Sequence, residues 1–117
     1  MTKNKNHMTM DAIRMRDFNH MVARHIETLG TREDFKILLE IAASQQKGTP
    51  LTLKQLLIDV NVPQSTLKRR LAGLVRRRIV TKQMTANDHR VYCYNLSDKA
   101  QGILKKLIAD IREYPWS

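Results

Sequence analysis

The residues best suited to chemistry in this chain form a short polar and basic run, and their chemistry is the binding of anions. Small polar side chains at Gln64, Ser65 and Thr66 come just ahead of two long cationic donors, Lys68 and Arg69. Amide, hydroxyl, ammonium and guanidinium groups in this order can hydrogen-bond base edges and phosphate oxygens when a helix enters the major groove of DNA. We predict that these five residues contact DNA in the major groove.

A second group of candidates lies in the turn-rich stretch Asp88-His89-Arg90, between two segments of alternating polarity. A carboxylate two residues from an arginine on a hairpin tip can accept a charge-assisted hydrogen bond and fix the guanidinium. We predict that these three residues contact DNA from the tip of a hairpin, with Asp88 orienting Arg90 toward the minor groove or the phosphates.

The charge of the chain is concentrated in the same region. The sequence has 21 Lys and Arg residues against 11 Asp and Glu, a net charge of +10. Residues 48–97 hold nine basic and two acidic side chains, whereas residues 1–47 hold eight and six, and residues 98–117 four and three. A basic block between nearly balanced flanks favours a polyanionic partner, nucleic acid first, over a merely solvated face. The predicted phosphate contacts are Lys82, Arg76, Arg77 and Arg78.

Length and composition exclude several other classes of protein. A chain of 117 residues is one domain's worth. No apolar run approaches the roughly 20 residues of a membrane span, so a soluble, cytoplasmic and nucleoid-associated protein is expected. The lone Cys93 excludes an internal disulfide and is expected to be a packed thiol rather than a redox switch; no His and Cys spacing indicates a metal. Without a paired-carboxylate motif or a Gly-rich phosphate loop, neither an enzyme nor a cofactor is expected.

Hydrophobic periodicity predicts the elements that must position the candidate residues. After a disordered lead-in over 1–8, a single domain is expected over 9–117. The expected helices cover residues 9–29, 32–46, 53–60, 64–78 and 98–114. Thr31 with Asp34 resembles a capping box, and Gly30 is a helix stop. The alternating segments 81–84 and 91–96 predict a two-stranded hairpin, and Leu51-Thr52 could add a very short strand.

The first and last of these helices carry more apolar surface than one small core can cover. Paired with a second copy, they would bury each other and set two DNA-reading helices about 34–36 Å apart, one turn of DNA. The predicted dimer contacts are Ile13, Phe18, Met21, Ile103, Leu107 and Ile111. The alternative is a monomer in which the two terminal helices pack on each other.

The order helix, turn, helix and basic hairpin over 51–96 is that of a winged helix-turn-helix. The expected fold class is therefore mainly α with a small β-hairpin wing (α+β), flanked by N- and C-terminal dimerisation helices. The stretch VPQSTLKRRLAGLVRRRIVTKQ resembles the recognition helix of the MarR-type winged-helix transcriptional regulators. Asp88-His89-Arg90, with the later Leu96-Ser97-Asp98-Lys99-Ala100, resembles the wing of that family and the entry to its last helices.

This resemblance implies a homodimeric regulator that binds a specific sequence of double-stranded DNA, an inverted-repeat operator. Repression by occluding a promoter is the simplest mechanism for a chain with no activation module. Two alternatives stay open: a non-specific architectural or replication-associated DNA-binding protein, and a winged-helix adaptor that binds protein or RNA. A small-molecule effector is not indicated by the sequence.

Overall fold

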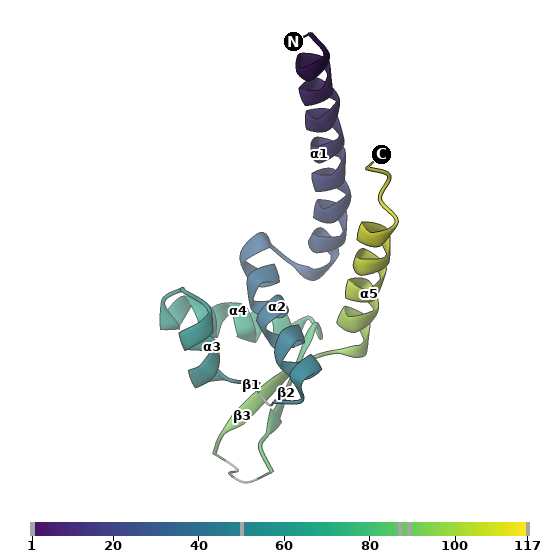
Figure 1. Ribbon diagram of the computed structural model, residues 1–117. Coiled ribbons are helices and arrows are strands. Elements are labelled where there is room, and N and C mark those ends of the chain that lie inside the picture. Colours follow the sequence, from purple (N-terminus) through teal and green to yellow (C-terminus); the bar gives the residue numbers. More distant parts are fainter. Residues whose placement is uncertain (1, 50, 87, 89, 117) are drawn as a thin grey trace.

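The computed structural model describes the backbone of residues 2–49, 51–86, 88 and 90–116, and the side chains of these from residue 10 onward. Two helices at the ends of the chain lie side by side above a lobe of three helices and a small sheet (Figure 1). In chain order the elements are α1 (Thr2–Leu29), α2 (Arg32–Lys47), β1 (Leu51–Thr52), α3 (Leu53–Asp59), α4 (Gln64–Arg76), β2 (Val80–Met84), β3 (Tyr92–Leu96) and α5 (Asp98–Arg112). This is the expected mainly helical fold with a small wing. None of the described helices is long and apolar enough to cross a membrane.

The hairpin is part of a three-stranded antiparallel sheet with the order β1-β3-β2. β2 pairs with β3 from Val80 opposite Leu96 to Met84 opposite Tyr92, and the two residues of β1 pair with the other edge of β3. The very short strand expected from the sequence thus joins the hairpin. Cys93 of β3 is buried, as expected for a packed thiol.

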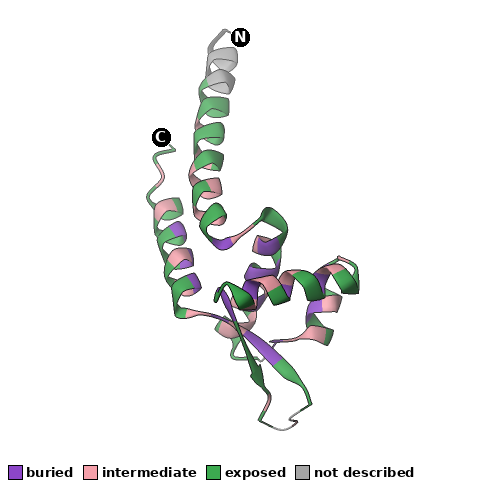
Figure 2. Ribbon diagram, turned by 180° about the vertical axis from the view of Figure 1, so that it is seen from behind, coloured by how far each residue is buried: buried purple, intermediate pink, exposed green. Residues whose placement is uncertain are grey.

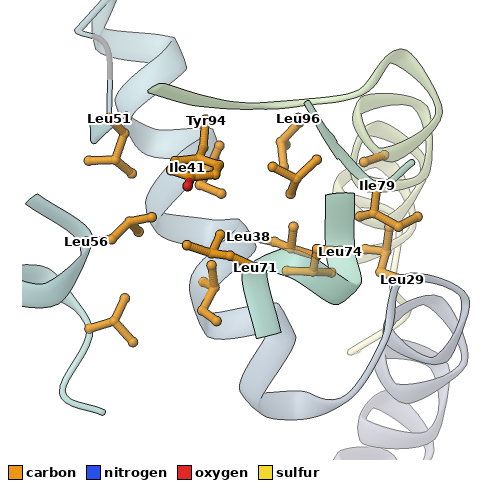
Figure 3. Packing of buried hydrophobic residues seen from close by; sticks show 14 of the residues in the cluster. Leu29, Leu38, Ile41, Leu51, Leu56, Leu71, Leu74, Ile79, Tyr94 and Leu96 are labelled. Carbon is orange, nitrogen blue, oxygen red and sulfur yellow. The ribbon is translucent and has the colours of Figure 1, made fainter. Parts of the chain in front are cut away.

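The core surrounds α2, whose apolar side chains point toward α4 on one side and the sheet on another (Figure 3). Ile37, Leu38 and Ile41 of α2 are at most 1% exposed, because this helix is covered by neighbours along most of its length. Figure 2 shows buried residues in the lobe and along α5, whereas the described side chains of α1 are exposed or intermediate up to its last residue, Leu29, which is buried. The other residues of this core include Leu56, Leu67, Leu71, Leu74, Ile79, Val80, Leu96, Ala100 and Leu104.

Short-range chemistry sets the helix boundaries. Thr31 accepts a hydrogen bond from the Asp34 amide (3.1 Å), and the Asp34 carboxylate accepts one from the Thr31 amide (3.0 Å), which confirms the predicted capping box. α4 ends at Arg76 rather than at residue 78, because Arg78 has a left-handed backbone (φ 61°) that ends the helix. α1 begins at Thr2, within the lead-in predicted over 1–8, and no Gly or Pro precedes residue 30 to stop helix growth toward the N-terminus.

The terminal helices pack against each other within one chain. His25 Nε2 of α1 lies 2.8 Å from Asp110 Oδ2 of α5, and the Tyr114 hydroxyl donates a hydrogen bond to the Arg14 carbonyl (3.0 Å). Phe18 contacts the rings of Tyr114 and Trp116, with centroids 5.0 and 5.1 Å away. The turn and tail after α5 thereby close over the middle of α1.

This packing corrects part of the predicted dimer surface. Leu107 is only 3% exposed and belongs to the core of its own chain, because its side chain faces the lobe and α1 rather than solvent. Met21 and Ile103 pack partly buried against the same core, and Phe18 is engaged by the C-terminal rings. Of the six predicted contacts, only Ile13 and Ile111 are exposed, at 46% and 39%.

Gly30 joins α1 to α2 in a conformation that leaves no room for a side chain. Its φ is +152°, and a Cβ there would lie 2.4 Å from Asp34 Oδ2 and 3.1 Å from Arg77 Nη2. Gly30→Ala is therefore expected to lower the free energy of unfolding by about 2–3 kcal/mol, from backbone strain and displacement of the carboxylate. Denaturant titration checks this.

The matched control is Gly48→Ala. Gly48 also has a positive φ (+75°), but nothing lies within 4 Å of its added Cβ, so only the backbone cost of about 1 kcal/mol is expected. If Gly30→Ala and Gly48→Ala lowered the free energy of unfolding equally, steric crowding at Gly30 would be contradicted.

Candidate nucleic-acid interface

α4 presents its predicted contact residues to solvent on the face opposite the core. Gln64, Ser65, Lys68 and Arg69 are exposed and Thr66 is half-buried. The pattern arises because leucines three and four positions apart turn the other face inward. Pro63 is the N-cap and forms no side-chain cap, so the first-turn amides of α4 stay available for an anion.

The wing projects from the lobe at the end opposite the chain termini (Figure 1). At its tip the Thr85 hydroxyl donates to the Asp88 carbonyl (2.8 Å), while the Asp88 amide donates to Thr85 Oγ1 (3.2 Å). Asp88 Oδ1 accepts from the Arg90 amide (3.0 Å) and from Arg90 Nε (3.4 Å). The Arg90 side chain is nevertheless 92% exposed. Its terminal guanidinium nitrogens can therefore bind an anion while its Nε is hydrogen-bonded to Asp88. His89, the third predicted wing contact, lies outside the described residues.

A hollow of ≈ 480 Å³ lies between α4 and the sheet. Lys68 and Arg76 line it from α4, and Lys82 lines it from β2. The Lys82 ammonium also lies 4.4 Å from the centroid of the Tyr92 ring, a cation–π contact that restricts its position. The remaining lining residues are Leu53, Leu71, Ala72, Val75 and Tyr94. Three cations around an apolar floor suit a phosphate backbone that passes between helix and wing.

Burial, and secondarily the charge of Tyr92, raises the pKa of Tyr94 in this hollow above its ordinary value of 10.0. The unfolded chain therefore releases this proton at a lower pH than the folded chain. The neutral phenol stabilises the fold fully below pH 10.0, and this contribution is lost as pH rises through the folded pKa.

Tyr94→Phe is expected to remove this alkaline loss. Lysines lose their protons in the wild-type protein and in the variant alike. The difference between the two proteins in how the free energy of unfolding changes with pH therefore reports the Tyr94 phenol. The check is the free energy of unfolding at about pH 9 and about pH 11, measured for both chains. A parallel decline in both chains would contradict the assignment to Tyr94.

Arg77 is placed differently from the other predicted phosphate contacts. Its Nη2 lies 3.4 Å from Asp34 Oδ2, and its Nη1 donates to the Leu29 carbonyl (3.1 Å). The Arg77 side chain is 46% exposed, but its guanidinium has partners within the chain. Arg76, Arg78 and Lys82 are also exposed and form no ion pair with the described residues. Of the four predicted phosphate contacts, Arg77 is thus the one that already has hydrogen-bonding partners within the chain.

Sequence reasoning missed the group to which Arg77 belongs. Asp34, only 5% exposed, also pairs with Arg70 (3.5 Å), whose Nη1 donates to Thr31 Oγ1 (3.1 Å). We call Thr31, Asp34, Arg70 and Arg77 the Asp34 cluster. The buried Arg70 Nε has no hydrogen-bond partner among the described residues. Two of the nine cations in the basic block therefore neutralise a buried carboxylate, and the signal that could have suggested this is the position of Arg70 beside the inward-facing leucines.

Comparison with solved structures finds the same fold in regulators of the MarR family. The S. aureus MepR–DNA complex is 16% identical, with a TM-score of 0.75 over 90% of this chain and 86% of that one. MepR bound to ethidium bromide is 17% identical, with a TM-score of 0.75 over 91% and 75%. Apo MarR from E. coli is 20% identical, with a TM-score of 0.62 over 86% and 73%. The sequence itself matches no family model and no curated protein. The winged-helix fold implied by the resemblance to MarR-type regulators is confirmed.

Proposed function

We propose that this protein is a transcriptional regulator that binds double-stranded DNA as a homodimer, reads a specific sequence and represses by occupying an inverted-repeat operator. One observation carries the proposal: the exposed polar and basic face of α4 lies beside a wing whose Arg90 is held by Asp88. The likeness to MepR, solved in complex with DNA, supports this choice. The protein would act in the cytoplasm, at the nucleoid.

In this proposal α4 is the recognition helix. Gln64, Ser65 and Thr66 approach base edges at its first turn, where small side chains let the backbone come close to the DNA. Lys68 and Arg69 extend one turn further and reach bases or phosphates. The first-turn amides add a favourable dipole for one phosphate.

The wing and the hollow hold the DNA backbone on one side of the recognition helix. Arg90 enters the minor groove or contacts its phosphates, and the bond from Asp88 lowers the entropy lost when the guanidinium is ordered. Lys82, Arg76 and Arg78 take phosphates. These phosphate contacts provide affinity for any duplex, whereas the contacts of the recognition helix with base edges provide the preference for one DNA sequence.

The proposed dimer uses apolar residues that the chain leaves uncovered. Ile13 and Ile111 are exposed, and the N-terminal part of α1 extends beyond the end of α5 (Figure 1). A second copy that covers these faces would place two recognition helices about 34–36 Å apart on one side of the duplex. Further exposed apolar residues are Met10 and Met15 on α1, Ile108 on α5 and Trp116 in the tail after α5.

Selection from a random double-stranded DNA library at near-physiological salt, followed by sequencing, tests the proposal. Enrichment of an inverted repeat with half-sites about one helical turn apart is the expected result. Retention of duplexes without sequence enrichment would instead indicate an architectural DNA-binding protein. If no duplex were retained, an adaptor for protein or RNA would replace the proposal.

A further inference from the structure

The Asp34 cluster joins three helices at a point away from the proposed reading face. Arg70 lies in the middle of α4 and Arg77 at its C-cap, seven residues and about two turns apart, so both approach the same side of the helix. Each pairs with one oxygen of the Asp34 carboxylate, at 3.5 Å and 3.4 Å. Two points on one helix held to one fixed group restrict its rotation as well as its position.

The backbone between α1 and α2 takes part in the same cluster. Arg77 binds the carbonyl of Leu29, the last residue of α1, while Arg70 binds the hydroxyl of Thr31, the N-cap of α2. Gly30 lies between them with no space for a Cβ. The end of α1, the start of α2 and the length of α4 are therefore linked through the buried Asp34 carboxylate, the half-buried Arg70 and the more exposed Arg77.

We infer that Asp34 is a positioning residue that fixes the orientation of α4 relative to α1. The inference rests on the proposed function, in which α1 carries the dimer face and α4 reads DNA. A two-fold DNA site requires both recognition helices at one separation and one angle. A less constrained α4 loses the preference for that site, while general attraction to a duplex, which comes from exposed cations, persists.

Asp34→Asn tests this with little change of shape. The amide oxygen can still accept the Thr31 amide and keep the helix cap, but the negative charge that holds both arginines is removed. By Coulomb attraction alone, the loss of one negative charge strengthens binding to every duplex. A fall in sequence preference therefore has no explanation in net charge.

The matched control is Glu33→Gln, at the adjacent position of the same first turn. Glu33 is exposed and forms no ion pair with the described residues, and its substitution makes the same change in net charge. The measurement is the ratio of affinities for the selected inverted repeat and a scrambled duplex. We expect this ratio to fall about tenfold in Asp34→Asn and to stay unchanged in Glu33→Gln. An unchanged ratio in a folded Asp34→Asn variant would overturn the inference.

Arg77→Gln provides a second variant in case Asp34→Asn fails to fold. It removes one of the two attachments and leaves the pair of Asp34 with Arg70 intact. Arg78→Gln, one residue away, makes the same charge change at an exposed arginine outside the cluster. A larger drop of the affinity ratio for Arg77→Gln than for Arg78→Gln supports the inference, and equal drops contradict it.

A distance measurement without DNA separates this inference from the proposed function. Spin labels at Arg24→Cys on α1 and Ala72→Cys on α4, in a Cys93→Ser background, report the distribution of distances within one chain diluted by unlabelled protein. We expect Asp34→Asn to widen this distribution and Glu33→Gln to leave it unchanged. Equal widths in all three chains would overturn the positioning role even if the wild-type chain reads DNA. If Asp34→Asn widens the distance distribution but the wild-type protein shows no preference for any DNA sequence, only the proposed function is rejected.

Discussion

Leu107→Asp is expected to unfold the chain rather than to divide a dimer. Leu107 is 3% exposed within its own core, so the substitution buries a carboxylate without a partner and removes an apolar side chain. The expected loss exceeds about 4 kcal/mol, a large part of the stability of a domain of this size. Circular dichroism during denaturant titration measures it.

Ile111→Asp is the comparison on the same helix. Ile111 is 39% exposed, so the same aspartate stays in contact with water and should cost the isolated chain less than about 1 kcal/mol. In the proposed dimer it places a charge in an apolar interface, and light scattering should show the mass falling by half. If Leu107→Asp instead stayed folded and halved the mass, Leu107 would belong to the dimer interface and not to the core.

Arg69→Ala should have the largest effect on recognition. Arg69 is exposed on the proposed reading face of α4 and has no ion pair with the described residues. If it contacts a base, its loss costs about 1–3 kcal/mol on the selected duplex and relaxes the preference at one position of each half-site. Titration of the selected duplex and of variants at each position measures both quantities.

Lys82→Ala supplies the contrast, because Lys82 lines the hollow where a phosphate is expected. It should weaken all duplexes alike and lower the slope of log affinity against log salt by about one. Equal losses for Arg69→Ala on selected and random duplexes would show that Arg69 also binds only the backbone.

Much of the fold could be predicted because it depends on short-range signals. The capping box at Thr31 and Asp34, the stop at Gly30 and the alternating wing strands are all local in sequence, and the structure contains each of them. The exposure of Arg69 follows in the same way from the spacing of the leucines in α4.

Two features could not be predicted because they depend on contacts distant in sequence. Asp34 lies 36 and 43 residues from Arg70 and Arg77, and the local pattern places Arg70 beside the inward-facing leucines without identifying the carboxylate that the two arginines meet. The apolar stripe that contains Leu107 has the same spacing whether its own chain or a second copy covers it. Periodicity gives the buried face of a helix, but not the partner that buries it.

The central claim is that α4 and the wing contact duplex DNA, and amide chemical shifts on adding the selected duplex test it most directly. We expect the largest changes at Gln64 to Arg69 and around Arg90, with smaller changes on α2 and α5. Changes concentrated on the outer faces of α2 and α5, with α4 and the wing unaffected, would contradict it.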